Sequence, residues 1–319
     1  MQMYNEQISG RTMAQRVDKF NMLVLMNTLL IILLFSKNIP NWTHSFADIS
    51  ITSTLYAFLI FLIAFIVSEK YNTVAHILLV VALYSHLFQV VSPLQHIIFP
   101  GWFDQQTVFA EDMLWGGEIS VLMQPLVTPV LAEWLMFAYV FYVPMIPLIG
   151  ILCYFKAGKF AAENYLYDFA RTCTVCYGGF ILFPLATPLF YQPDVYDIPL
   201  TGGIFTYCGE WIRSNQHFPG GGLPSPHAAV GTFMLLYVRR YIPRLFMPTL
   251  ILVLSIYMAT VYCRYHYIWD TLAGISAALV VFKYHPSKNG FADRLLSLFK
   301  VSDLRVPSSI NIINRRTKS

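Results

Sequence analysis

Long apolar segments follow one another along most of this 319-residue chain. A helix needs about 20 apolar residues to cross roughly 30 Å of hydrocarbon. Only helices and closed barrels satisfy their backbone hydrogen bonds inside a bilayer. The sequence therefore predicts an all-α, polytopic membrane bundle of about eight transmembrane helices. They are expected at residues 20–36, 50–67, 73–91, 129–154, 171–189, 225–238, 245–262 and 267–283.

The composition excludes a soluble enzyme. Charged residues make up 12% of the chain and hydrophobic residues 56%, whereas soluble proteins carry about 25% charged residues. The net charge of +4 does not indicate nucleic-acid binding, because the placement of the charges matters more here than their sum. The bilayer is therefore an expected partner, and a nucleic acid is not.

The distribution of positive charges gives the chain an orientation. Eight crossings divide the polar segments into two sides, and 18 of the 21 Lys and Arg residues fall on one of them. The other side has Lys37, Arg213 and Arg264. Lys and Arg are enriched in the cytoplasmic loops of membrane proteins. We therefore expect a multi-pass protein of the cell membrane with both termini cytoplasmic. The outward segments would be 92–128, 190–224 and 263–266.

Two segments outside the spans differ in character. Residues 101–126, between the third and fourth spans, mix aromatic with acidic side chains, which is typical of a helix in the headgroup region. This segment is either a connecting loop anchored by aromatic residues or a lid over a substrate. Residues 287–319 are basic and polar, and we interpret them as a cytoplasmic tail. The simplest organisation is one transmembrane domain over residues 1–286 followed by this tail.

A glycine-rich loop precedes the sixth apolar segment. Three glycines that end at Gly222 are followed by the run Pro224-Ser225-Pro226-His227 after one leucine. This order predicts a tight loop that leads into a helix N-terminus, where free N–H groups and the helix dipole favour an anion. Ser225 would cap the helix or donate to a phosphate. Phosphate is therefore the expected ligand.

A second polar cluster lies where the seventh segment turns into the eighth. Arg264, His266 and Asp270 fall within seven residues. A lone histidine here would be a headgroup-level anchor, but three such groups at a membrane boundary are costly enough to indicate a site. His266 and Asp270 are four residues apart, so on one helical face the carboxylate can orient the imidazole. Arg264 is permanently charged and suited to phosphate.

The two clusters are 39 residues apart, counted from His227 to His266. One helix, a basic turn at residues 239–244 and a returning helix use about that length. Both histidines should therefore lie at the same outer mouth of the bundle, beside the glycine-rich loop.

These residues together resemble the type-2 phosphatidic acid phosphatase superfamily, over about residues 171–283. The resemblance implies a helical core and an outward active site that uses no metal or other cofactor and forms a phosphohistidine. It implies that His266 is the nucleophile and that Asp270 orients it. His227 would be the acid that protonates the leaving oxygen and then activates water or an acceptor hydroxyl.

The same resemblance implies the substrate-binding residues. Arg264, Ser225 and loop amides such as that of Gly222 would hold the phosphoryl oxygens. The family's first motif, a Lys followed by an Arg-Pro pair, has no clear counterpart in the chain, and Arg213 is the candidate substitute. Arg213 and His217 are either substrate contacts or ordinary loop residues.

More than one reaction fits this resemblance. The first expectation is a phosphatase that acts on a lipid phosphate at the outer membrane face. Arg264 stands two residues before His266, which is closer to the inositol-phosphorylceramide-synthase-like branch and implies a phosphotransferase between lipids as the alternative. A transporter is a distant alternative, because the polar residues cluster at one mouth and do not line a path through the bundle.

Overall fold

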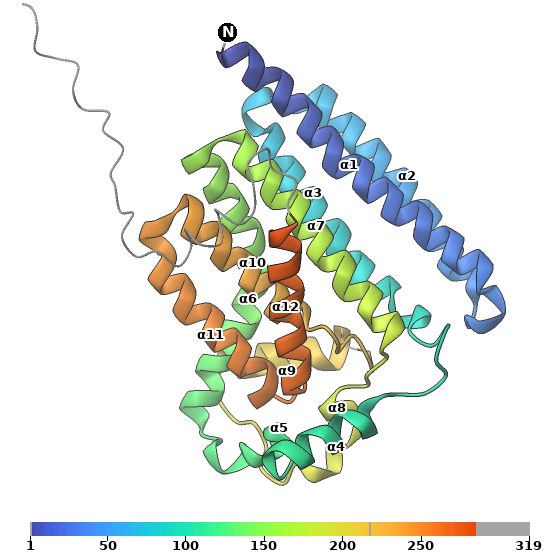
Figure 1. The fold of residues 1–319 in the computed structure, drawn as a ribbon, viewed down its shortest axis with the longest axis vertical. Coiled ribbons are helices and arrows are strands. Elements are labelled where there is room, and N and C mark those ends of the chain that lie inside the picture. Colours follow the sequence, from blue (N-terminus) through green and yellow to red (C-terminus); the bar gives the residue numbers. More distant parts are fainter. Residues whose placement is uncertain (1, 217, 285–319) are drawn as a thin grey trace, which may run out of the picture. The chain divides into compact units, whose positions relative to one another are not determined.

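The computed structural model describes residues 2–216 and 218–284, which fold mainly into α-helices (Figure 1). No strand occurs among these described residues. The tail expected at 287–319 lies outside them. The α-helices are α1 (Gln2–Leu34), α2 (Trp42–Ile66), α3 (Glu69–Val90), α4 (Asp104–Trp115), α5 (Ile119–Leu122), α6 (Pro129–Ala157), α7 (Lys159–Leu182), α8 (Pro188–Tyr191), α9 (Ile204–Gln216), α10 (Pro226–Tyr241), α11 (Phe246–Tyr262) and α12 (Ile268–Lys283).

Five helices in the described part of the chain are long and apolar enough to cross a membrane. They confirm the expected all-helical fold of a membrane type, although they account for five of the eight expected spans. The five segments are Arg16–Leu34, Trp42–Ile66, Tyr71–Val90, Pro129–Ala157 and Pro243–Tyr262.

The other three expected spans correspond to α7, α10 and α12. Helices α10 and α12 have 16 residues each. At 1.5 Å per residue they are about 24 Å long, which is shorter than the roughly 30 Å of a hydrocarbon core. Their length therefore does not confirm the two spans that their apolar runs predict. Both helices begin at the turns that hold the two histidine clusters.

Helix α7 differs from the span expected at 171–189. It begins at Lys159, well before the apolar run. Its first half carries the buried acidic residues Glu163 and Asp168, which interrupt the apolar pattern but not the helix. It also ends earlier than expected, close before Pro184, because the residue that precedes a proline disfavours helical angles.

Residues 1–282 form one unit by their contacts. Within it α6, α7, α10 and α11 pack closely, α3 contacts α6 and α7, and α1 lies along α7 (Figure 1). Helix α12 approaches the start of α10 at Gly274, where an added Cβ would overlap the carbonyl oxygen of Ser225. The missing side chain at Gly274 therefore lets the two histidine-bearing segments come together.

Short helices gather at one end of the bundle, where α4, α5, α8 and α9 lie (Figure 1). In α4, Asp104 and Glu111 are buried, while Phe109, Met113 and Leu114 are 63%, 70% and 62% exposed. Asp104 and Glu111 thus face the protein, while these three apolar side chains face away from it. This is the reverse of a helix on the surface of a soluble protein.

Candidate functional site

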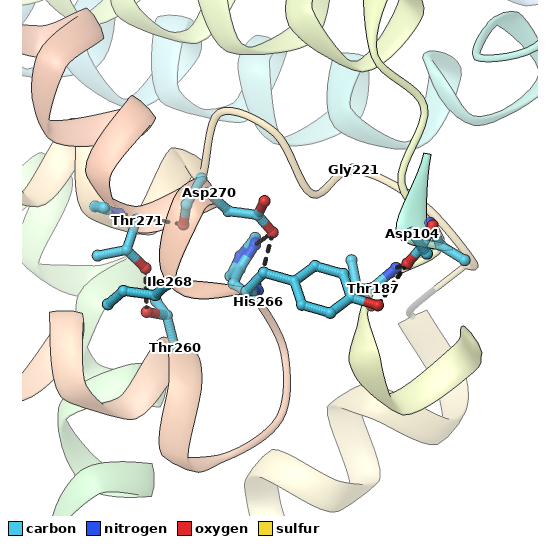
Figure 2. A network of polar contacts seen from close by, with 12 residues as sticks. Asp104, Thr187, Gly221, Thr260, His266, Ile268, Asp270 and Thr271 are labelled. Atoms are coloured by element: carbon cyan, nitrogen blue, oxygen red, sulfur yellow. Dashed lines mark hydrogen bonds and ion pairs between the residues drawn. The ribbon is translucent and has the colours of Figure 1, made fainter. Parts of the chain in front are cut away.

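His266 and Asp270 form a buried pair at the start of α12 (Figure 2). The distance from His266 Nδ1 to Asp270 Oδ2 is 3.2 Å, and the two residues are 4% and 0% exposed. A proton on Nδ1 satisfies the carboxylate and leaves the Nε2 lone pair available. The pair therefore presents one ring nitrogen that is suited to nucleophilic attack.

The turn between α11 and α12 fixes the backbone of His266. The N–H groups of Tyr265 and His266 donate to the carbonyl oxygen of Thr260, at 3.1 and 2.8 Å. The Thr260 hydroxyl lies 2.8 Å from that of Thr271 in α12 (Figure 2). Arg264 has a φ of 68°, which is uncommon for a residue with a side chain. The turn is therefore tight and bonded to both helices.

The two histidines lie close together although they are far apart in the sequence. The ring centroids of His227 and His266 are 5.7 Å apart, at an interplanar angle of 61°. The N–H of Ser225 donates to the carbonyl oxygen of Asp270 at 2.9 Å, which joins the two segments directly. The Ser225 hydroxyl also accepts from the N–H of Ala228 at 3.4 Å. Ser225 therefore caps α10 and places His227 in its first turn.

Aromatic rings surround His227. Its ring stacks on Tyr139 at a centroid distance of 4.2 Å and lies 4.6 Å from the ring of Tyr142. Tyr139 in turn stacks on Tyr265 at 4.4 Å. The Tyr142 hydroxyl donates to the carbonyl oxygen of Pro226 at 3.1 Å. This packing restricts the orientation of the imidazole and lowers the local dielectric constant, so charges near it interact strongly.

The glycine-rich loop lies against the carboxylate of Asp270. A Cβ at Gly222 would lie 3.1 Å from Asp270 Oδ2 and 3.0 Å from the Cβ of Leu185. The next glycine back, Gly221, has a φ of 72°, and its N–H donates to Gln95 Oε1 at 2.8 Å. The loop can therefore approach the carboxylate because it has no side chains at these positions.

Arg264 is 6% exposed and is oriented by the loop between α8 and α9. Its guanidinium donates to the carbonyl oxygen of Ile198 and lies 4.3 Å from the ring centre of Tyr196. The Tyr196 hydroxyl donates to Glu118 Oε1 at 2.8 Å. A guanidinium has five N–H donors, so the bond to Ile198 leaves donors of Arg264 for an anion.

Arg213 lies in α9, where its Nη2 is 2.7 Å from Glu210 Oε2. Its side chain is 31% exposed. The neighbouring His217 lies outside the described residues. The structure thus places Arg213 in an ion pair of its own helix.

Alanine variants should rank the two arginines. A partly exposed ion pair contributes little, so we expect Arg213→Ala to lower kcat/KM for a phosphate ester less than about tenfold. Arg264→Ala should lower it at least about a hundredfold, as loss of an oxyanion donor does. Steady-state kinetics would measure both losses, and equal losses would contradict this ranking.

Three buried residues near the site were not expected from the sequence. They are Asp104 and Glu111 of α4 and Tyr267 of the turn. Asp104 Oδ1 accepts from the Tyr267 hydroxyl at 2.8 Å, and Glu111 Oε1 accepts from the N–H of Ile268 at 3.0 Å. The mixture of acidic and aromatic residues in 101–126 indicates an interfacial segment. It does not indicate which groups the acidic side chains contact.

Burial changes the acidity of the two carboxyl groups of α4. Burial raises the pKa of Asp104 to about 6, although hydrogen bonds from the N–H of Ala186 and the hydroxyl of Tyr267 oppose the change. Burial also raises the pKa of Glu111 to about 7, against hydrogen bonds from two backbone N–H groups. Both groups therefore exchange a proton near neutral pH, where exposed carboxyl groups are ionised.

A family model matches more than half of the chain. The family is described as the PAP2 superfamily, and the match covers residues 107–284. It contains both histidine clusters, the glycine-rich loop and most of α4, and it begins before the region expected from the motifs. Neither curated proteins nor solved structures show a significant match to the chain.

Proposed function

Because the chain belongs to the PAP2 superfamily, we propose that it is a membrane lipid phosphate phosphatase that acts through a phosphohistidine. Phosphatase or phosphotransferase activity on phosphate esters is general in this superfamily. The proposal depends on one observation above all. The rings of His227 and His266 are 5.7 Å apart, and a buried carboxylate holds one of them.

In the first proposed step, His266 Nε2 forms a bond to phosphorus while the bond from phosphorus to the lipid oxygen breaks. Protonated His227 donates its proton to that oxygen, so the lipid leaves as a neutral alcohol. Asp270 stabilises the positive charge on the ring of His266. Arg264 and N–H groups of the glycine-rich loop, such as that of Gly222, stabilise the phosphoryl oxygens.

In the second proposed step, water replaces the histidine. Neutral His227 takes a proton from a water molecule, whose oxygen attacks phosphorus as the nitrogen–phosphorus bond to His266 breaks. Inorganic phosphate leaves, and both side chains return to their starting states. Each ester consumes one water molecule. Side chains supply the nucleophile, the acid and the base, so this mechanism uses no metal or other cofactor.

We place the site at the outer face of the cell membrane, with both termini in the cytoplasm. The support is the concentration of 18 of the 21 Lys and Arg residues on one side of an eight-span topology. In this topology α7, α10 and α12 complete the eight crossings. The exposed apolar side chains of α4 fit the headgroup region. A lipid phosphate would then meet the histidines at the depth of the headgroups.

The same arrangement supports a phosphotransferase as the second candidate. A hydroxyl group of another lipid or of a polyol would replace water, and His227 would take its proton in the same way. The position of Arg264 two residues before His266 favours this candidate, because it resembles the inositol-phosphorylceramide-synthase-like branch.

The products of one incubation would test both candidates. Purified protein would be given a radiolabelled lipid phosphate, with and without an alcohol acceptor. We expect free phosphate without the acceptor, at a rate that EDTA does not change. A new phosphorylated lipid with the acceptor, and no free phosphate without it, would favour transfer. Neither product, or a loss in EDTA that a divalent cation restores, would contradict the proposed mechanism.

A further inference from the structure

A chain of hydrogen bonds connects α4 to the His266–Asp270 pair (Figure 2). The Tyr267 hydroxyl donates to Asp104 Oδ1 at 2.8 Å. The backbone N–H of Tyr267 donates to Asp270 Oδ2 at 3.2 Å. His266 Nδ1 is also 3.2 Å from this same Asp270 oxygen. Tyr267 thus connects a carboxylate on α4 to the carboxylate that orients the proposed nucleophile.

Asp104 also accepts hydrogen bonds from a second segment of the protein. Its two carboxylate oxygens accept from the N–H groups of Ala186 and Thr187, at 2.7 and 3.0 Å. These residues belong to the loop between α7 and α8. Thr187 also lies beside the glycine-rich loop, since a Cβ added to Gly222 would be 3.2 Å from Thr187 Cγ2. One buried carboxylate therefore joins α4 to two loops of the site. Tyr267 is the third donor to it.

Glu111 provides a second attachment. It lies seven residues after Asp104, so both carboxylates occur on the same face of α4. Its Oε1 accepts from the N–H of Ile268 at 3.0 Å, and its Oε2 accepts from the N–H of Ile119 at 2.9 Å. Ile268 is the first residue of α12. Helix α4 therefore binds two adjacent residues, Tyr267 and Ile268, of the turn between α11 and α12, which we call the catalytic turn.

We propose that α4 positions the catalytic turn, with Asp104 acting through Tyr267 on Asp270 and Glu111 fixing the start of α12. The proposal rests on the proposed function, in which His266 attacks phosphorus. Asp104 lies outside the residues that the family model matches. Neither carboxylate is placed at the reacting atoms, so both are positioning residues rather than catalytic ones.

The expected effect follows from the geometry of attack. A displacement of about 1 Å in a catalytic group can cost about a hundredfold in rate. Asparagine at position 104 has one acceptor oxygen for three donors, so Asp104→Asn should release the turn. Tyr267→Phe removes a single hydroxyl and leaves the backbone bond to Asp270. In both variants kcat should fall about 10- to 100-fold, while KM changes less than about threefold because the groups that bind phosphate remain.

The test combines kinetics with hydrogen exchange of the full-length protein in detergent. Exchange is measured for the peptide that contains the N–H groups of His266, Tyr267 and Ile268, and it should be faster in Asp104→Asn and in Tyr267→Phe. The matched control is Asp112→Asn, the same change at an exposed position of α4. It should leave both kcat and exchange unchanged. If Asp104→Asn does not fold, Tyr267→Phe carries the test.

The outcomes separate this proposal from the proposed function. If the wild type is active and both variants keep its kcat, the positioning role is wrong and the proposed function stands. If the wild type releases no phosphate, the proposed function fails, and exchange still decides whether α4 holds the turn. Unchanged exchange in both variants, or an equal change in Asp112→Asn, would overturn the proposal. The proposal is supported if exchange is faster and kcat is lower in Asp104→Asn and in Tyr267→Phe but not in Asp112→Asn.

Discussion

His266→Ala should release no measurable phosphate from a lipid phosphate ester. Alanine removes the nitrogen that the proposed mechanism bonds to phosphorus. Loss of a covalent nucleophile costs several orders of magnitude in other enzymes, so kcat should fall at least about a thousandfold. KM should change little, because Arg264 and the glycine-rich loop remain in place.

The matched control is His44→Ala, the same substitution at an exposed histidine of α2. It should keep the wild-type kcat. Thermal unfolding in detergent would show that both variants fold, which matters because His266 is 4% exposed. If folded His266→Ala keeps more than about a tenth of the wild-type kcat, His266 is not the nucleophile. Even the loss of a general acid or base lowers the rate by more than about tenfold.

The sequence predicts the membrane-type helices and the proximity of the histidines because both depend on short stretches of chain. Apolar length decides whether a helix can cross a bilayer. His227 and His266 are 39 positions apart, and the chain between them holds most of α10, a turn and α11. The ends of this hairpin must lie at similar heights. The roles of these residues in catalysis remain predictions.

The contacts of α4 could not be predicted in this way. Asp104 is 82 residues from Ala186 and 163 residues from Tyr267. No periodicity or spacing encodes a contact over such a distance, since it depends on how the whole bundle packs. The start of α12 is a similar case, because the N–H of its first residue, Ile268, donates to Glu111, which lies 157 residues away in the sequence.

His227→Ala should impair the hydrolysis of an alkyl phosphate by about 10²- to 10⁴-fold, the contribution of a general acid–base group. An alkoxide leaves poorly unless it receives a proton, and the variant has no acid to supply it. A nitrophenyl phosphate has a stable leaving group that needs no proton. The first step should therefore survive with this substrate. The second step still lacks its base, so the phosphoryl group should accumulate on His266.

Rapid mixing of His227→Ala with the aryl substrate would make this accumulation visible. We expect a burst of nitrophenol close to the enzyme concentration, followed by slow turnover, and acid-labile phosphate attached to the protein. His266→Ala should give no burst. Equal losses on alkyl and aryl substrates, without a burst, would show that His227 does not act on the leaving group. Its importance would then lie in its packing between Tyr139 and Tyr142.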